Sequence, residues 1–291
     1  MNNAILYGLT VLIWGSTWIG IKFQLGDVDP MASIGHRFFL SSLLIGAFLL
    51  LRRQRVRLPL RQHPYLLLQG LCLFCCNYYF IYNASMVLTS GLVAVVFGCL
   101  LIFNVVNGAL FMGTPVRGGV LLGGFIGLAG MGMVFWPELE SLNLNDEVFV
   151  ALLYCLAGTL LASFGNIIAA RNRTHDIPVL VTNTWAMGYG ALMMYGAALM
   201  SGATISVAWN VSYIASLLYL VVFGSVIAFW AYLTLIGRMG ADRAGYANLV
   251  FPLVALLIST VFESYQWTLP ALAGMGLILV GNYLVMRSAR A

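Results

Sequence analysis

The chain has 291 residues, of which 62% are hydrophobic and 8% are charged, about a third of the charged fraction of a soluble globular domain. With a mean hydropathy of +0.95 it cannot cover itself in water. The formal net charge of +5 therefore indicates orientation in a membrane, so membrane lipid is expected as a partner and nucleic acid is not.

Apolar segments of the length of a transmembrane helix, roughly 20 residues, follow one another along the chain. The expected spans are 4–23, 32–51, 64–84, 91–112, 119–136, 148–169, 178–200, 212–236, 244–262 and 269–286. The first has no basic n-region and is of full spanning length, so we interpret it as a span and not as a signal peptide. The expected fold class is an all-α polytopic membrane protein with ten transmembrane helices, with no room for a separate soluble domain.

Charge alternates between the connections of these spans. Every second connection and the C-terminus carry the arginines, namely Arg52, Arg53, Arg55, Arg57, Arg61, Arg117, Arg171, Arg173, Arg238, Arg243, Arg287 and Arg290. The other connections carry Asp27, Asp29, Glu138, Glu140, Asp146, Glu147 and Glu263, with no basic residue among them. Because cytoplasmic loops are enriched in Lys and Arg, both termini are predicted to be cytoplasmic.

Spans one and two carry the first candidate site residues. Trp14 and Trp18 are four residues apart and so share one helical face. Lys22, His36 and Arg37 lie near the outer ends of their spans, beside the acidic first connection. They are candidates for an outer gate or for contact with a substrate carboxylate, although long basic side chains at such depths often only snorkel to the headgroups.

Spans three and four carry an aromatic and amide group. Tyr78, Tyr79 and Tyr82 share a broad face of span three, and Phe97 and Asn104 lie on a stripe of span four. Aromatic rings stack on aromatic substrates or attract an ammonium group, and buried amides need a partner or water. We expect these residues to line a substrate cavity; the alternatives are an interfacial aromatic belt and ordinary helix contacts.

The second half of the chain carries similar residues. The further candidates for substrate binding are Trp185 and Tyr189 in span seven, Phe229 and Trp230 in span eight, and Tyr246 and Asn248 in span nine. Pro252 is expected to break the helix of span nine, because it cannot donate to the carbonyl of residue 248. Helix packing is again the alternative for the rings and amides.

A shift of 151 residues superimposes parts of the two halves. It brings Gly123 onto Gly274 and Gly130 onto Gly281, and the Tyr78–Tyr79 pair onto Phe229–Trp230. Five spans per half is an odd number, so the repeats 1–140 and 141–291 are predicted to be inverted in the membrane with a site where they meet. The glycines of spans five and ten indicate close helix packing, within a monomer or at a homodimer contact.

Several motifs together resemble the paired EamA repeats of the drug/metabolite transporter superfamily. They are the run Trp14-Gly15-Ser16, Arg37, the run from Gly240 to Ala244, Pro252 and Glu263; Leu101 and Met112 stand at the first-half positions that match the last two. The resemblance implies a ten-helix exporter of the cell inner membrane that carries amino acids, aromatic and other neutral ones or related metabolites, by alternating access.

Residue types absent from the spans limit the mechanism. No acidic residue lies inside a span, which disfavours coupling through a membrane carboxylate. Export of aromatic or quaternary cationic drugs is the alternative. A channel is a less favoured alternative. An enzyme is also less favoured, because the three histidines are scattered and no HExxH or GxSxG motif occurs. The five cysteines are interpreted as packing residues, and neither a metal nor a cofactor is expected.

Overall fold

The structure is a computed structural model that describes residues 1–24, 26, 28–140, 142, 144–262 and 267–288. The side chains of residues 18, 19, 22, 90, 91, 138, 259, 261 and 262 lie outside this description. Throughout the described part, every regular element is helical. The predicted all-α class is therefore confirmed.

The elements follow one another as α1 (Asn3–Lys22), α2 (Pro30–Leu51), η1 (Leu60–Gln62), α3 (His63–Gln69), η2 (Gly70–Cys76), α4 (Asn77–Val87), α5 (Ser90–Gly98), α6 (Leu100–Met112), α7 (Gly118–Val134), α8 (Trp136–Glu140), α9 (Asp146–Thr174), α10 (Val179–Met200), α11 (Val211–Tyr219), η3 (Leu220–Ile227), α12 (Ala228–Met239), α13 (Ala241–Ala244), α14 (Ala247–Phe262) and α15 (Leu269–Arg287). Within the described residues, seven helical stretches are long and apolar enough to cross a membrane, and Gly118–Val134 is a shorter apolar helix. The apolar helices α1 and α10 have 20 and 22 residues.

Helix ends coincide with residues that favour them. The Asp29 carboxylate accepts a hydrogen bond at 2.8 Å from the amide of Met31, and Pro30 occupies the first turn of α2, where its missing N–H costs nothing. Asn145 caps α9 in the same way. Gly113, with a φ of 63°, ends α6 in the left-handed conformation, which glycine adopts without a Cβ clash.

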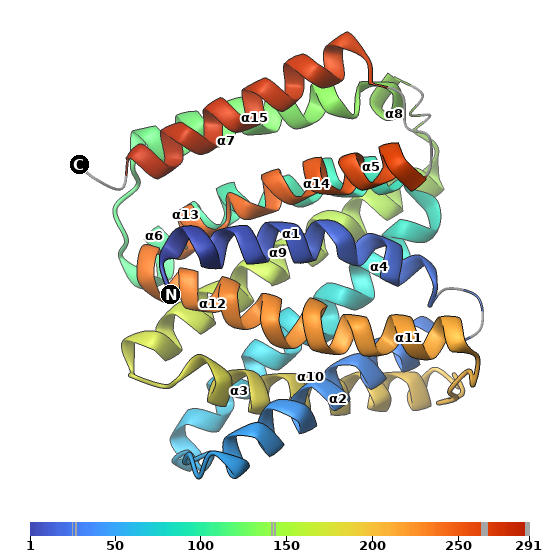
Figure 1. The fold of residues 1–291 in the computed structure, drawn as a ribbon, viewed down its shortest axis with the longest axis vertical. Coiled ribbons are helices and arrows are strands. Elements are labelled where there is room, and N and C mark those ends of the chain that lie inside the picture. Colours follow the sequence, from blue (N-terminus) through green and yellow to red (C-terminus); the bar gives the residue numbers. More distant parts are fainter. Residues whose placement is uncertain (25, 27, 141, 143, 263–266, 289–291) are drawn as a thin grey trace.

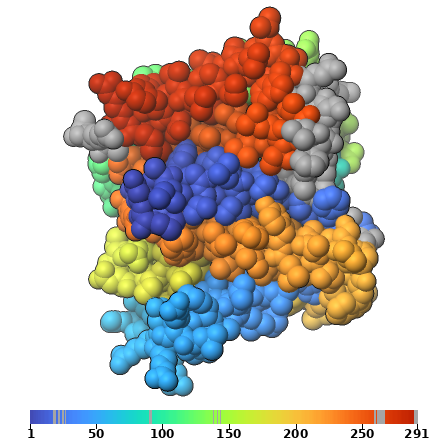
Figure 2. Space-filling view, in the orientation of Figure 1, coloured from blue at the N-terminus to red at the C-terminus, as the bar shows by residue number. Residues whose placement is uncertain are grey.

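The helices are stacked in layers between two outer pairs (Figure 1). α7 packs on α15 at one end of the long axis, and α2 packs on α10 at the other. Between them α1 contacts α12 and α14, while α9 contacts α4 and α6. Segments far apart in sequence are therefore interleaved, as the alternating colours of the space-filling view also show (Figure 2).

Glycines allow α7 and α15 to approach closely. A Cβ at Gly123 would lie 2.6 Å from the carbonyl oxygen of Gly281, and one at Gly130 would lie 2.5 Å from that of Gly274. Both contacts join the two halves, and the 151-residue shift exchanges one contact for the other. The predicted packing role of these glycines is confirmed.

The two ends of the helices differ in charge. The N-terminus and the C-terminal end of α15 lie at one end, together with the connections that carry Arg52 to Arg61 and Arg117, whereas α8 lies at the other (Figure 1). We call these the basic end and the acidic end; the acidic end also holds Asp29, Asp146 and Glu147. Loops expected on opposite sides of a membrane are thus at opposite ends of the bundle.

Candidate functional site

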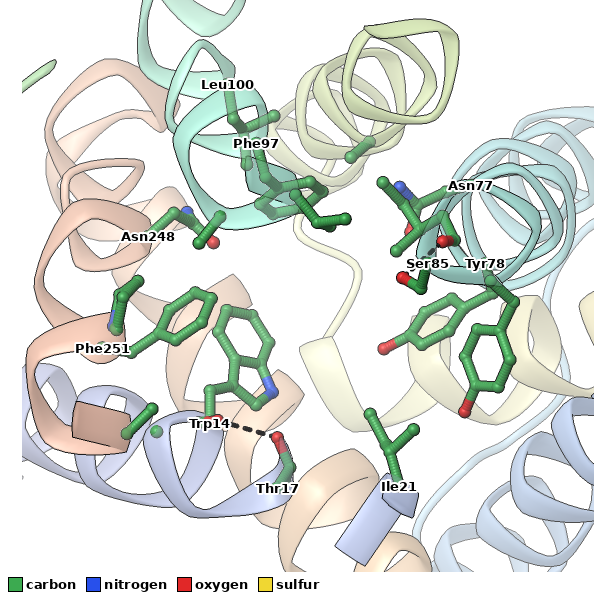
Figure 3. Close-up of a pocket in the computed structure, with 18 of the residues that line it drawn as sticks. Trp14, Thr17, Ile21, Asn77, Tyr78, Ser85, Phe97, Leu100, Asn248 and Phe251 are labelled. Atoms are coloured by element: carbon green, nitrogen blue, oxygen red, sulfur yellow. Dashed lines mark hydrogen bonds between the residues drawn. The ribbon is translucent and has the colours of Figure 1, made fainter. Parts of the chain in front are cut away.

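A cavity of about 490 Å³ lies among the central helices, a size typical of small-molecule sites. Its walls come from both halves, as Figure 3 shows, with Trp14 and Phe251 facing Tyr78 across the space. Its aromatic, polar and charged lining residues are Trp14, Thr17, Arg37, Asn77, Tyr78, Tyr82, Ser85, Phe97, Phe135, Asn166, Phe229, Tyr232, Asn248 and Phe251. No Asp, Glu, Lys or His lines it in the part of the chain that the structure describes.

The cavity extends toward the acidic end. Ile21, Met86 and Ile258 line it, and each stands near the end of a helix that runs to that side. No lining residue comes from the arginine-rich connections at the opposite end. The cavity therefore lies in the part of the bundle nearer the acidic end, and we call it the vestibule.

The π-helical segments η2 and η3 lie beside this cavity and at matching places in the two halves. Such segments displace the regular backbone hydrogen bonds and occur often at functional sites. In η3, the Gly224 carbonyl accepts hydrogen bonds from Trp14 Nε1 at 3.2 Å and from Arg37 Nη2 at 3.3 Å. The unusual helix thus orients two lining side chains.

Arg37 is a buried cation, with 2% of its surface exposed. Its Nε donates to Ser225 Oγ at 2.8 Å, and its guanidinium carbon lies 5.4 and 5.3 Å from the ring centres of Phe38 and Tyr78. Among the described residues, its Nη1 has no hydrogen-bond partner and Arg37 forms no ion pair. The Asp29 carboxylate, which could have paired with Arg37 in an outer gate, caps α2 instead; Asp27 lies outside the described residues.

Aromatic rings build the walls around this cation. The ring centre of Trp14 lies 5.1 Å from that of Phe229 and 4.9 Å from that of Tyr232. Tyr78 and Tyr82 follow at 6.4 Å on the facing wall. These edge-on and tilted contacts are the geometries that aromatic pairs prefer, so the rings hold one another in place around an open space.

Buried amides close the cavity toward the basic end. Asn166 Nδ2 donates to Asn104 Oδ1 at 3.3 Å and to the Tyr232 hydroxyl at 3.0 Å. Asn104 Nδ2 donates to the Ala241 carbonyl at 3.0 Å, and Asn248 Nδ2 donates to the Tyr232 hydroxyl at 3.4 Å. We call Asn104, Asn166, Tyr232 and Asn248 the amide network. It joins α6, α9, α12 and α14, and the fully buried Asn166 Oδ1 has no partner in the described structure.

Many of the predicted site residues come together here. The structure places these in the cavity wall: Trp14, Arg37, Tyr78, Tyr82, Phe97, Phe229, Asn248 and Pro252. Asn104 does not line the cavity but accepts a hydrogen bond from Asn166, which does, in the amide network. Pro252 lies inside α14, so the helix continues past it and the expected break is absent. The side chains of Trp18 and Lys22 lie outside the description.

Other predicted residues lie away from the cavity. Tyr79 is 37% exposed on the outer surface, and Trp230 packs beside the main core without lining the cavity. Successive helical residues point about 100° apart, so only the first member of the Tyr78–Tyr79 and Phe229–Trp230 pairs faces inward. Adjacency in sequence was mistaken for a shared face.

Three further predicted residues have long aromatic side chains that contact other parts of the protein instead of lining the cavity. Tyr246 is buried between α7 and α15, where its hydroxyl donates to the Ile278 carbonyl at 2.9 Å. Trp185 Nε1 donates to the Val56 carbonyl at 2.9 Å, and the Tyr189 hydroxyl bonds His63 Nδ1 at 2.7 Å. These three residues are corrected from cavity lining to helix contacts.

His36 is also occupied elsewhere. Its ring nitrogens lie 2.7 Å from the Tyr195 hydroxyl and 2.9 Å from the Ser206 carbonyl oxygen, so it anchors α2 to α10 and the following loop. Sequence reasoning missed Asn77, Asn166 and Tyr232, although an asparagine inside an apolar span was an available signal.

Comparisons with known proteins also divide the chain into two similar parts. The model of the EamA-like transporter family matches residues 2–136 and again 149–287. The chain is 29% identical over 94% of its length to the uncharacterized inner membrane transporter YedA of Escherichia coli strain K12, of which 89% is covered. It is 25% identical to a probable amino-acid metabolite efflux pump of the same strain, with 97% and 94% of the two chains covered. A crystal structure shares the fold, with a TM-score of 0.82, 18% identity, and 99% and 97% of the two chains covered.

Proposed function

Because the chain belongs to the EamA-like transporter family and is a multi-pass membrane transporter, we propose that it exports amino acids, aromatic and other neutral ones or related metabolites, from the cytoplasm. The observation that carries this proposal is Arg37, a buried cation that lines an aromatic cavity and keeps one guanidinium nitrogen unpaired within the described residues. An amino acid offers a carboxylate for that nitrogen and an apolar side chain for the rings.

The proposed architecture is ten transmembrane helices in two inverted repeats, 1–140 and 141–291, with both termini in the cytoplasm. The seven spans and the shorter helix noted above are then completed by α1 and α10. Support comes from the exchange of the Gly123–Gly281 and Gly130–Gly274 contacts under the repeat shift. The location of the N-terminus and of the C-terminal end of α15 at the basic end also supports it (Figure 1), because cytoplasmic loops are basic. The inner membrane is the proposed location.

The position of the cavity supports transport by alternating access. The vestibule extends toward the acidic end, which is the outer side in this orientation, and the hydrogen-bonded amide network lies on its cytoplasmic side. Export requires the substrate to enter from the basic end, so the hydrogen bonds of the network must separate in part of the cycle. Four neutral hydrogen bonds of about 1 kcal/mol each form a closure that thermal motion opens.

The purified protein in liposomes tests the function directly. Vesicles loaded with an unlabelled amino acid are expected to take up the labelled one by counterflow, with rates that saturate. The panel includes aromatic, neutral and charged amino acids together with a quaternary aromatic cation. Preference for the cation would favour the drug-export alternative, which the buried Arg37 opposes by charge. Flux that rises linearly without saturation would indicate a channel.

An imposed pH gradient is expected to leave the transport rate unchanged. The described cavity wall contains no carboxylate or histidine, so no group with a pKa near neutrality is in place to carry a proton with the substrate. The measurement compares uptake of one neutral amino acid with and without a gradient of about two pH units, which spans the range where such groups titrate. An uptake rate that rises in one gradient direction only would show proton coupling and would contradict transport without a coupled ion.

Two neighbouring tyrosines give a matched test of the cavity. Tyr78→Ala is expected to reduce aromatic amino acid flux about tenfold, because one stacking ring in a site contributes about 1–3 kcal/mol. Tyr79→Ala removes the same ring from the outer surface and is expected to leave flux close to that of the wild type. Equal effects of the two variants would remove Tyr78 from the substrate site.

A further inference from the structure

A second hollow, of about 450 Å³, lies on the outer surface between α2 and α10. It shares no residue with the central cavity. We call it the lateral groove, and it is lined by Ser42, Leu43, Gly46, Ala47, Leu50, Val56, Thr184, Trp185, Gly188, Tyr189 and Leu192. It runs along the outermost helix pair of the bundle (Figure 1).

Two glycines and a short hydrogen bond shape the floor of the lateral groove. Ser42 Oγ donates to the Thr184 carbonyl at 2.6 Å, which holds α2 and α10 together. A Cβ at Gly188 would lie 2.9 Å from Ser42 Oγ, so a side chain there would displace the Ser42 hydroxyl. Gly46 continues the hollow one turn further along α2. The floor is therefore fixed by contacts between helices that both face lipid.

The walls of the lateral groove are apolar and open to the outside. Leu43, Leu50 and Leu192 are 53%, 68% and 59% exposed. Because α2 is long and apolar enough to cross a membrane, we expect these exposed walls to face hydrocarbon. An apolar hollow that is open to the membrane suits a lipid acyl chain.

One end of the lateral groove is fastened to the arginine-rich connection. Trp185 Nε1 donates to the Val56 carbonyl at 2.9 Å, which ties the segment between Arg55 and Arg57 to α10. His63 packs edge-on against Trp185 with ring centres 4.8 Å apart. The basic segment is thus held at the groove mouth by side chains that also line the groove.

The charge at this mouth is uncompensated. Arg52, Arg53, Arg55, Arg57 and Arg61 are all exposed. The sequence has no Asp or Glu between Asp29 and Glu138. The acidic residue of the adjoining α9–α10 loop is Asp176, and the ion pair found in the described part of the chain joins Arg117 to Asp242 instead. Five guanidinium groups therefore remain available for an anion.

We propose that the lateral groove binds an anionic phospholipid of the leaflet at the basic end. One acyl chain lies between Leu43 and Leu192, and Arg55 and Arg57 hold the phosphate. The pattern is a basic pocket between transmembrane helices on the side where anionic headgroups are recognised, with arginine suited to bidentate phosphate contact. The lipid braces the α2–α10 pair and is distinct from the transported substrate.

Native mass spectrometry of the purified protein tests this site without any transport assay, so its result is independent of the proposed function. The probes are phosphatidylglycerol and phosphatidylcholine with identical acyl chains, and inorganic phosphate alone. Phosphatidylglycerol is expected to bind about tenfold more tightly than phosphatidylcholine, and inorganic phosphate is expected not to displace it. Displacement by phosphate, or equal binding of the two lipids, would overturn the proposal.

Two variants separate the groove from general basic charge. Arg55→Gln with Arg57→Gln is expected to reduce phosphatidylglycerol binding about tenfold, whereas Arg238→Gln with Arg287→Gln removes the same charge elsewhere and is expected to retain it. Ala47→Phe fills the groove from an exposed position and is expected to weaken both lipids. Equal losses in the two arginine pairs, or full binding in the filled variant, would contradict a built site.

Discussion

Replacing Arg37 by glutamine is expected to lower amino acid flux at least about tenfold. A hydrogen bond to a charged group contributes about 1.5–3 kcal/mol, which is about a tenfold to hundredfold change in affinity. Glutamine keeps a polar side chain opposite Ser225 and Gly224 but removes the cation that would bind the carboxylate. The measurement is saturable counterflow in liposomes, with folding checked by size-exclusion chromatography.

A second substrate and a second variant make this result specific. The decarboxylated amine of the same amino acid is expected to be a poor substrate of the wild type, and Arg37→Gln is expected to narrow the difference between acid and amine. Arg117→Gln removes a partly exposed charge paired with Asp242 and is expected to transport normally. An Arg37→Gln protein that stays folded and transports amino acids at the wild-type rate would remove the carboxylate contact.

Substituting the glycines between α7 and α15 is expected to have the largest effect on stability. A Cβ at Gly274 would overlap the carbonyl oxygen of Gly130 and lie 2.9 Å from the amide nitrogen of Val134. The clash is with backbone, which cannot rotate away, so Gly274→Ala is expected to destabilise by about 1–3 kcal/mol. Thermal unfolding of the purified protein in detergent measures the loss.

The control for this substitution lies in the same helix. A Cβ at Gly276 would meet nothing within 4 Å, and alanine favours the helix over glycine by about 1 kcal/mol in water. Gly276→Ala is therefore expected to unfold at the wild-type temperature or slightly above it. If both variants unfold together, the close approach of α7 and α15 is not what stabilises this pair.

The sequence was most informative where a physical requirement repeats along the chain. The 151-residue shift brings Gly123 onto Gly274 and Gly130 onto Gly281, and the close crossing of α7 and α15 leaves no room for a side chain at these four positions. The all-helical class followed from apolar segments of uniform length. Arg37 was identified as well, since a buried cation in a span is costly and therefore uncommon.

Side-chain direction and reach were not predictable from spacing. Tyr246 and Trp185 are of residue types that often line a substrate cavity. Each nevertheless donates a hydrogen bond from its polar atom to a backbone carbonyl of another segment. The amide network was missed because its members come from four helices. Their meeting depends on helix rotation, which periodicity in nearly uniform apolar segments does not define.

The most direct test of the account asks whether the central cavity itself holds the substrate. Ser85 lines the vestibule and is exposed. Of the five native cysteines, Cys72, Cys75 and Cys155 are buried and none lines the cavity, so the wild type serves as the blank. The measurement is the rate at which a membrane-impermeant maleimide labels Ser85→Cys from the outer side. We expect rapid labelling that a transported aromatic amino acid slows and its decarboxylated amine does not. Labelling from the cytoplasmic side only, or a rate that no transported amino acid changes, would contradict the account.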